Sequence, residues 1–266
     1  MDECARQALR RELVCHPKPG LVSPVDAGSH SDMDAETFRR SIDALRGYFA
    51  EMAAAGAVGA DFAALNLIGR RAEQRMYEAT GGRNTHRGAV FSLGLLAAAA
   101  GRGALDARGL CGGVARAWGR EMLAFRRPQG LTNGEFVRLR YGAPGAREEA
   151  ASGFPTVLVR GLPALRAAEA AGLDANAAAL HALFSIMAVL DDNNVLFRGG
   201  PEGLDFVRAE ARAFLATGGM LSVGAMKRAG GVHRRFVDRG LSPGGAADLL
   251  AATLFVAGCE DLGRDA

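Results

Sequence analysis

The sequence predicts an all-α protein, a single-domain bundle of about ten helices over residues 1–266 with glycine-rich functional loops and no sheet. Apolar residues recur at spacings of three and four along most of the chain, which is the period of an α-helix. Glycine and proline interrupt these stretches, and the 36 glycines fall mainly in the connections. No internal repeat, low-complexity tract or linker divides the chain.

The periodic stretches define the expected helices in chain order. After an N-terminal helix that Pro17 and Pro19 end, helical patterns cover 35–56, 65–77, 89–100, 114–125, 162–171 and 175–190. The segments 89–100 and 175–190 are apolar nearly all round, so we expect them in the core. Pro201 suits the first turn of the next helix, and helices over 220–237 and 244–257 close the chain. Only 155–160 has a strand-like pattern, and one short run cannot form a sheet.

Composition excludes several classes of protein. Hydrophobic residues make up 49 % of the chain and charged residues 23 %, which is typical of a folded protein and not of a disordered one. The longest uncharged run, 175–190, falls short of the roughly 20 apolar residues that span a bilayer, so we expect no membrane segment. A net charge of +3 does not favour nucleic acid as a partner. Acids near the N-terminus argue against a signal peptide, so a cytoplasmic location is expected.

The loop over 15–34 carries the first group of candidate residues. Pro17 and Pro19 stiffen the backbone around Lys18, which could bind a phosphate as a point charge. His30 and Asp32 follow and could act in proton transfer. The alternative is structural, with the prolines ending one helix and Ser31 or Asp34 capping the next.

A second loop, 81–88, leads directly into a buried helix. Backbone N–H groups at a helix N-terminus attract anions, and Arg83, His86 and Arg87 add donors. Asn84 or Thr85 could equally cap that helix, and both interpretations can hold together. The Walker A pattern is absent, so P-loop chemistry has no support.

Two later segments carry carboxylates. Glu149, beside Arg147, could be a general base or a metal ligand, although a solvated run of charges explains the same pattern. Asp191 and Asp192 are expected at the end of a buried helix, where acids oppose the helix dipole and a bound cation would relieve the conflict. Oxygen ligands of this kind suit Mg²⁺, which commonly also binds substrate phosphates. The loops together therefore indicate a nucleoside triphosphate as the substrate.

Several separated motifs, in this order, resemble the triphosphoribosyl-dephospho-coenzyme A synthase family. They are CHPKPGLV (15–22), GSHSDMD (28–34), NTHRGAVFSLGLL (84–96), EEAASGFPTV (148–157), DDNNVLFRGG (191–200) and LSPGGAADLLAATLF (241–255). The resemblance implies an all-helical fold and a reaction in which ATP and 3′-dephospho-CoA give the triphosphoribosyl dinucleotide and adenine. The product would pass to an acyl-carrier-protein transferase that serves citrate lyase or malonate decarboxylase.

The resemblance also implies roles for individual residues. Glu149 takes the family's glutamate position and is the expected base, with His30 on the side of the leaving adenine and Asp32 as the next candidate. The expected nucleotide contacts are Lys18, His86, Arg87, Arg147, Asn194 and Arg198, and the expected Mg²⁺ ligands are Asp191 and Asp192. The chain departs from the family at Phe197, where a histidine is usual, so the ring at that position is not expected to act as the base.

Two other functions stay open at this point. The chain could be an ATP-dependent ribosyl transferase with a different acceptor, or a non-catalytic nucleotide-binding helical protein. Release of adenine would distinguish both enzymes from the binding protein, and dependence on the acceptor would distinguish the two enzymes. The sequence does not fix the oligomeric state and leaves a homodimer open.

Overall fold

The computed structural model describes residues 1–125 and 133–264. Within these two ranges the chain forms thirteen α-helices, a π-helical turn and a 3-10 turn, and no β-strand, so the all-α prediction is confirmed. The first six helices are α1 (Asp2–Val14), α2 (Ala35–Ala44), α3 (Tyr48–Ala57), α4 (Phe62–Ala79), α5 (Arg87–Gly101) and α6 (Ala107–Ala124). They are followed by α7 (Asn133–Tyr141), α8 (Ala146–Ala151), α9 (Leu162–Ala170), α10 (Ala175–Met187), α11 (Asn193–Ala216), α12 (Ala225–Asp238) and α13 (Gly244–Arg264).

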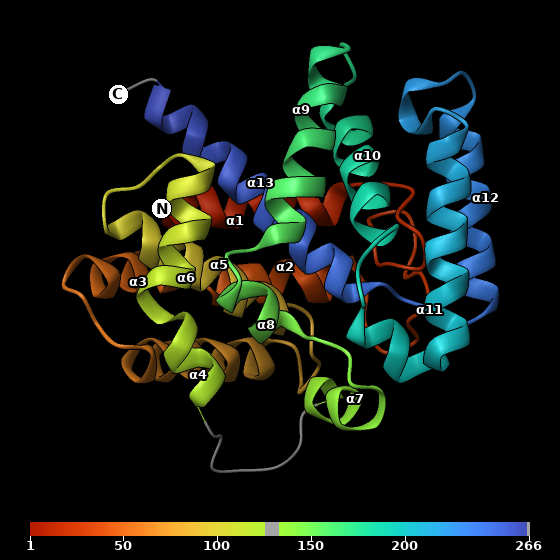
Figure 1. Cartoon of the computed structure of the whole chain (residues 1–266). Coiled ribbons are helices and arrows are strands. Elements are labelled where there is room, and N and C mark those ends of the chain that lie inside the picture. Colours follow the sequence, from red (N-terminus) through yellow and green to blue (C-terminus); the bar gives the residue numbers. More distant parts are fainter. Residues whose placement is uncertain (126–132, 265–266) are drawn as a thin grey trace.

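Two helices form the centre of the bundle. Helix α5 packs against α3, α4, α6 and α13, and eleven of its fifteen residues are buried. Helix α13 packs against α1, α5 and α10, which brings the first and last helices of the chain together. Figure 1 shows α11 and α12 side by side at one edge of the bundle. The apolar pattern of 89–100 thus identified a core helix correctly.

Three segments differ from the sequence-based expectations. The stretch expected as one helix over 35–56 is broken between α2 and α3, where Gly47 adopts φ 81°. The strand-like run 155–160 is helical and overlaps the π-helical turn Val157–Gly161, because it packs among helices and has no partner strand among the described residues. The expected helix over 220–237 starts later, at Ala225, after the 3-10 turn Gly219–Leu221.

Helix α11 contains a break that was predicted from the sequence only in part. Gly200 adopts φ 62° and ψ −164°, a conformation that favours glycine, and Pro201 begins the second part of the helix as expected. The residues before the break, which were expected to form a loop, already form helical turns from Asn193 onward. Arg198 therefore projects from a helix and not from a loop.

Aspartate side chains cap many of these helices. In each case the carboxylate accepts a backbone N–H from the first turn, which satisfies donors that have no partner inside the helix. The capping residues are Asp34, Asp61, Asp106, Asp174 and Asp192, at the starts of α2, α4, α6, α10 and α11. Among the described residues, no helix has the length and apolar character to span a membrane.

Candidate active site

Helices α11 and α13 begin next to each other because one carboxylate caps both. Oδ1 of Asp192 accepts the backbone N–H groups of Asn194 (2.9 Å) and Val195 (3.3 Å), and its Oδ2 accepts that of Ala246 (2.8 Å). Asp192 is only 2 % exposed. Burial raises the pKa of its carboxyl group, and the N–H donors oppose that rise. Asp192 therefore fixes the two helix starts relative to each other.

This position corrects one step of the sequence analysis. Helix α10 ends at Met187, so Asp191 and Asp192 do not lie at its C-terminus. Asp192 lies at the N-terminus of α11, where a carboxylate is favoured by the helix dipole. The conflict that indicated a bound cation is therefore not present. Oδ1 of Asp191 lies 2.8 Å from Nη2 of Arg208 and forms an ion pair with it.

A second carboxylate, that of Asp248, lies against the start of α5. Its Oδ2 lies so close to α5 that a Cβ atom on Gly88 would be only 2.0 Å from it. Only glycine at position 88 permits this approach. Burial raises the pKa of Asp248 well above its usual value, and the neighbouring carboxylates of Asp192 and Glu12 raise it further. Unlike Asp192, Asp248 is partly exposed.

Two consecutive asparagines connect the start of α11 to its neighbours. Nδ2 of Asn194 would lie 2.2 Å from a Cβ atom on Gly244, so it lies directly against the start of α13. Nδ2 of Asn193 would lie 2.8 Å from a Cβ atom on Gly145, which places it against the start of α8. The helix starts of α5, α8, α11 and α13, which we call the helix-start junction, thus meet around polar side chains.

His30 and Arg198 form a cluster beside this junction. Nη2 of Arg198 donates to Nδ1 of His30 (3.2 Å), which leaves Nε2 of His30 to donate to the Oγ of Ser242 (2.9 Å). Nη1 of Arg198 donates to the carbonyl oxygens of Ser29 (3.2 Å) and Gly240 (3.0 Å). Burial and the charge of Arg198 lower the pKa of His30, so the ring is neutral. The structure thus brings together two of the predicted site residues.

Asp32 lies at the edge of this cluster. Its Oδ1 is 3.8 Å from Nδ1 of His30, and its side chain is largely exposed. At that distance the carboxylate and the ring make no hydrogen bond. Asp32 does not cap α2, because Asp34 fills that role together with Thr37. The capping alternative for this loop is thus correct for Asp34.

Lys18 is not presented to solvent. Its side chain is 1 % exposed, and Nζ donates to Oε1 of Glu12 (2.5 Å) and to the carbonyl oxygen of Glu12 (2.7 Å). The two prolines thus direct the lysine inward, where it forms a buried ion pair with α1. In this conformation the ammonium group holds the loop to α1.

His86 and Arg87 stand at the start of α5. Nδ1 of His86 and Oγ of Ser41 lie 2.7 Å apart, while Nε2 is buried without a hydrogen-bond partner among the described residues. Burial lowers the pKa of His86 to about 3. Nε of Arg87 lies 3.4 Å from Oε2 of Glu73, and its backbone N–H donates to Oδ1 of Asn84 (3.2 Å). Asn84 therefore helps to cap α5, as the structural interpretation expected.

Glu149 and Arg147 lie on the short helix α8. Oε1 of Glu149 accepts the backbone N–H of Thr156 (2.8 Å) and Oε2 accepts its hydroxyl (3.1 Å). Burial raises the pKa of Glu149, and the two hydrogen bonds oppose the rise. Nη1 of Arg147 donates to the carbonyl oxygen of Phe125 (3.1 Å), and Nη2 lies 3.9 Å from Glu135. The arginine therefore contacts the end of α6 and helix α7, and not the carboxylate of Glu149.

The expected Mg²⁺ ligands do not form a metal site in this arrangement. Both oxygens of Asp192 are occupied by backbone N–H groups, and Asp191 faces Arg208. Within residues 1–125 and 133–264, no group of three or more His, Cys, Asp or Glu side chains is arranged to hold a metal ion. Binding of Mg²⁺ stays a prediction, and in this conformation the side chains of Asp191 and Asp192 are bonded to other groups.

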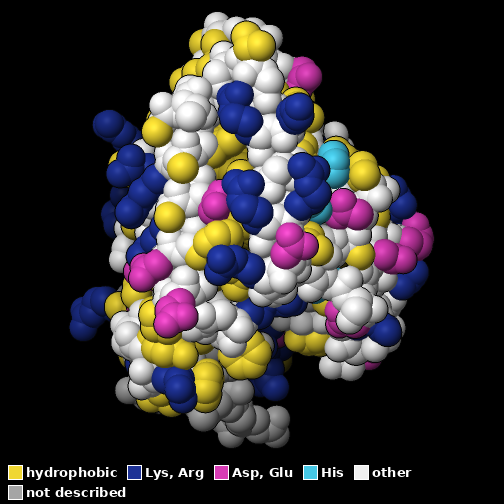
Figure 2. All heavy atoms as spheres, turned by 90° about the vertical axis from the view of Figure 1, so that its right-hand side faces the viewer, with side chains coloured by type: hydrophobic (Ala, Val, Ile, Leu, Met, Phe, Trp, Pro, Cys, Tyr) yellow, Lys and Arg dark blue, Asp and Glu magenta, His cyan; other side chains and the backbone are white. Residues whose placement is uncertain are grey.

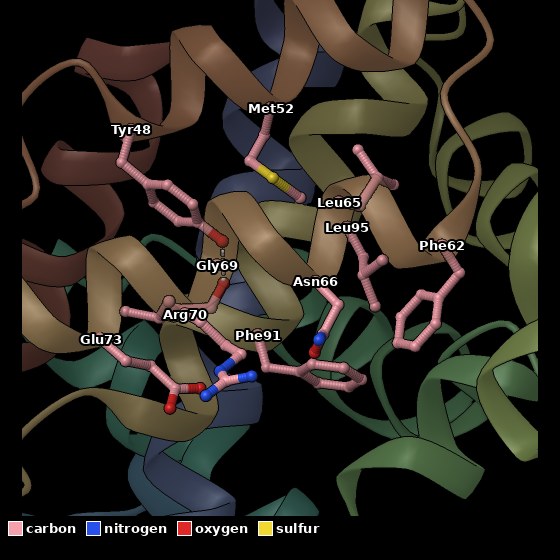
Figure 3. A pocket seen from close by; sticks show the side chains of 11 residues that line it. Tyr48, Met52, Phe62, Leu65, Asn66, Gly69, Arg70, Glu73, Phe91 and Leu95 are labelled. Carbon is pink, nitrogen blue, oxygen red and sulfur yellow. Dashed lines mark hydrogen bonds between the residues drawn. The ribbon is translucent and has the colours of Figure 1, made fainter. Parts of the chain in front are cut away.

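Neither of the two pockets described lies over the junction. Figure 3 shows a small pocket between α3, α4 and α5, with Tyr48 and Glu73 among its lining side chains, and it has room for about one water molecule. A broader groove follows α12 and the loop at Asp26, with His233 and Arg234 in its wall. On the face that includes α11 and α12, Figure 2 shows basic side chains interspersed with acidic ones.

Two charged residues of this region, Asp248 and Glu12, were not predicted from the sequence. Asp248 is the only charged residue between 244 and 259, and a single acid in an otherwise apolar helix was a signal that could have identified it. Glu12 gave no such signal, because it lies among charged residues of an amphipathic helix. Its role depends on the turn that brings Lys18 back onto α1.

Comparison with known proteins identifies the family. The family described as ATP:dephospho-CoA triphosphoribosyl transferase matches residues 1–265. A protein of Acinetobacter calcoaceticus named as a probable 2-(5''-triphosphoribosyl)-3'-dephosphocoenzyme-A synthase is 41 % identical, with 96 % of this chain and 89 % of the relative covered. A Klebsiella pneumoniae protein named as that synthase is also 41 % identical, with 94 % and 87 % covered. No solved structure matches the chain significantly. The chain therefore belongs to the ATP:dephospho-CoA triphosphoribosyl transferase family and is a transferase.

Proposed function

We propose that this enzyme transfers the 5-triphosphoribosyl group of ATP to the ribose 2′-hydroxyl of 3′-dephospho-CoA and releases adenine. The observation that carries the proposal is the match over nearly the whole chain to proteins that are named for this product, at 41–43 % identity. Four of the six motifs that carry the resemblance, 28–34, 84–96, 191–200 and 241–255, also meet in space. The segments around residues 30, 88, 145, 194 and 244 all lie at the helix-start junction or the adjoining cluster of His30 and Arg198.

The reaction breaks one bond and forms one. The bond between ribose C1′ and the adenine nitrogen of ATP breaks, and its electron pair leaves with the base. The 2′-hydroxyl oxygen of the acceptor forms the new bond to C1′, and its proton goes to a base on the enzyme. A single displacement inverts the configuration at C1′ and passes through a transition state with oxocarbenium character. The triphosphate stays intact and acts as a handle that orients C1′.

The residues of the site suit this chemistry in different ways. Arg198 is fixed by two carbonyl oxygens and His30, and its forked guanidinium can bind phosphate oxygens. Glu149 is the proposed base because burial raises the pKa of its carboxyl group towards the working pH. His30 is neutral and can accept or donate hydrogen bonds on the side of the leaving group, and Asp32 is the next candidate for the base.

The remaining proposed contacts place the nucleotide near α5 and α11. Arg87 and Asn194 project from the first turns of these helices, and Arg147 lies at the start of α8. Lys18 and His86 are buried, so they support the geometry of the loops and do not approach a phosphate in this conformation. Mg²⁺ is proposed as the companion of the triphosphate, whose charge it would neutralise.

The product is proposed as the precursor of the prosthetic group of an acyl-carrier subunit. In this proposal a separate transferase attaches it to the carrier of malonate decarboxylase or citrate lyase. The two pathways use the same precursor, so the site described above serves either. The genes that neighbour the coding sequence would distinguish them.

Incubation of the enzyme with ATP and 3′-dephospho-CoA, followed by mass analysis, tests the reaction. We expect adenine and the triphosphoribosyl dinucleotide in equal amounts, and neither when the acceptor is left out. Adenine release with a different alcohol but not with dephospho-CoA would identify another ribosyl transferase, and ATP binding without adenine release would identify a binding protein. EDTA should abolish the reaction and Mg²⁺ restore it, whereas full activity in metal-free buffer would contradict the metal requirement.

A further inference from the structure

Two exposed aromatic rings meet beside the helix-start junction. The ring of Phe197, on the first turns of α11, packs edge to face against that of Phe136 on α7, with 5.9 Å between the ring centroids and 82° between the ring planes. Helix α7 lies against α11 (Figure 1). Phe197 is nevertheless 48 % exposed and Phe136 41 %, so each ring keeps open surface on which a planar ligand can stack.

Asn193 places an amide group next to these rings. It precedes Phe197 by one helical turn, so the two side chains lie on the same face of α11. Oδ1 of Asn193 is buried and accepts no hydrogen bond from any described residue. A buried acceptor without a donor destabilises the protein, and an N–H group of a ligand would satisfy it. Adenine has both a flat aromatic face and a 6-amino group that donates hydrogen bonds.

These residues lie on the side of the site where the acceptor has to bind. Nδ2 of Asn193 lies against Gly145, whose carbonyl oxygen accepts the backbone N–H of Glu149 (3.0 Å) one turn along α8. His30 lies instead beside Ser242, before α13. In a single displacement the attacking oxygen and the leaving base lie on opposite sides of C1′. With Glu149 as the base and His30 beside the leaving adenine, the α8 side receives the attacking hydroxyl.

We propose that Phe136 and Phe197 bind the adenine ring of 3′-dephospho-CoA, and that Asn193 accepts a hydrogen bond from its 6-amino group. This inference rests on the proposed function, because it needs dephospho-CoA as the acceptor. The ribose that supplies the attacking 2′-hydroxyl also carries this adenine, so a ring held against Phe197 brings the hydroxyl towards Glu149. The two rings and the amide thus select and position the acceptor and take no part in proton transfer.

Truncation of Phe197 tests the stacking contact. Stacking of a base on an aromatic side chain changes affinity about 5–150-fold, so Phe197→Ala should raise the KM for dephospho-CoA by that factor at saturating ATP, with little change in the KM for ATP. Phe197→Tyr, which keeps the ring, should keep the parent values. Leu67→Ala, at an exposed apolar residue of α4, is the matched control and should change neither KM. Because both KM values come from the same protein, a partly unfolded variant lowers kcat without altering the comparison.

A deaminated acceptor tests the amide contact. Dephospho-CoA with hypoxanthine in place of adenine has a carbonyl oxygen where the 6-amino group was, so it offers Asn193 no donor at that position. We expect the parent enzyme to prefer the adenine acceptor about 5–150-fold in kcat/KM, because the hypoxanthine form leaves the buried oxygen unpaired. Asn193→Ala should lose most of this preference, whereas Phe197→Tyr should keep it.

The outcomes separate acceptor binding from other roles. An unchanged KM for dephospho-CoA in Phe197→Ala would overturn the proposal. A rise in the KM for ATP alone would place the adenine of ATP on the rings, and equal rises for both substrates would mean general damage to the site; either result would overturn the assignment to the acceptor. A preference that Asn193→Ala retains would exclude the amide contact. A parent enzyme that forms no triphosphoribosyl dinucleotide would instead overturn the proposed function, whereas an active parent with unaffected variants would overturn this inference alone.

Discussion

Oδ2 of Asp192 accepts the backbone N–H of Ala246 at 2.8 Å, so the residue that begins α11 also caps α13. Asn194 and Arg198 lie on the first turns of α11, and Ser242, the partner of His30, lies just before α13. The hydrogen bond between Asp192 and Ala246 therefore fixes the two halves of the candidate site relative to each other. The geometry of the candidate site therefore depends on how the N-termini of α11 and α13 are capped.

Replacing Asp192 should destabilise the fold more than replacing an ordinary cap. Asp192→Ala removes acceptors from two helices and leaves buried N–H groups unpaired, so we expect the free energy of unfolding to fall by about 2–3 kcal/mol. Asp174 caps a single helix of the described part of the chain, α10, through the N–H of Ala177, so Asp174→Ala should cost about 1 kcal/mol. Urea unfolding measures both. Equal losses would show that the bond to α13 contributes nothing.

The buried pair of Lys18 and Glu12 gives a second prediction. Lys18→Ala leaves a buried carboxylate without its partner and should lower the free energy of unfolding by about 3–5 kcal/mol. The double variant Glu12→Leu/Lys18→Met removes both charges and should recover most of that loss. Thermal or urea unfolding of the three proteins checks this. If Lys18→Ala weakens ATP binding at unchanged stability, the lysine reaches a phosphate in another conformation.

His86 makes the stability depend on pH. Its pKa is lowered to about 3 in the folded protein by burial, whereas in the unfolded chain it is near 6.5, so the unfolded chain binds the proton first. The free energy of unfolding is therefore not reduced by His86 above about pH 6.5, and it decreases as the pH is lowered below this value. Between pH 7 and pH 5 this residue should lower it by about 2 kcal/mol. His86→Gln should remove this part of the slope in urea unfolding at the two pH values. An unchanged slope would contradict the assignment to His86.

Arg198 should contribute to nucleotide affinity. Loss of one charge-assisted contact to phosphate costs about 1.5–3 kcal/mol, so Arg198→Ala should weaken ATP binding roughly 10–150-fold in calorimetry. Arg39→Ala is a suitable control because Arg39 is exposed on α2 and, among the described residues, pairs with Glu36 alone. Unchanged ATP affinity together with a raised KM for dephospho-CoA would assign Arg198 to the acceptor.

The fold class and the core helices could be predicted from periodicity because burial of an apolar face depends on local spacing. The strand-like run 155–160 was ambiguous for a physical reason, since a β-branched residue such as the buried Val157 packs equally well between helices when the described residues offer no partner strand. The break at Gly200 followed from the glycine and proline pair. The start of α11 at Asn193 could not be predicted from the sequence, because its capping residue, Asp192, also depends on contact with α13.

The loops of the candidate site could be predicted from the sequence, but the contacts between them could not. His30 and Arg198 are 168 residues apart in the chain, and the sequence gives no indication that they share a hydrogen bond. For Lys18, the two flanking prolines predict a rigid loop but do not predict the direction in which the lysine side chain points. Asp248 escaped notice because its position against α5 depends on a missing side chain at Gly88, which lies on another helix.

Glu149→Gln gives the most direct test of the catalytic base. Glutamine keeps the size of the side chain and can accept a hydrogen bond from Thr156, but it cannot take a proton. Turnover should fall about 10²–10⁴-fold with little change in ATP affinity. Because burial raises the pKa of Glu149, the rate of the parent enzyme should increase with pH through a range above that of an ordinary glutamate, and the variant should lack this increase.

Stability separates this effect from damage to the fold. A carboxyl group whose pKa is raised on folding contributes stability at low pH that is lost as the pH rises through its folded value. Removing that ionisation should therefore leave Glu149→Gln no less stable than the parent near pH 8, as measured in urea. Glu148→Gln, which changes the neighbouring acid bonded to the N–H of Gly145, is the matched control and should keep turnover within a few-fold of the parent. A Glu149→Gln enzyme that retains more than about a tenth of the parent rate would exclude the residue as the base and make Asp32 the next candidate.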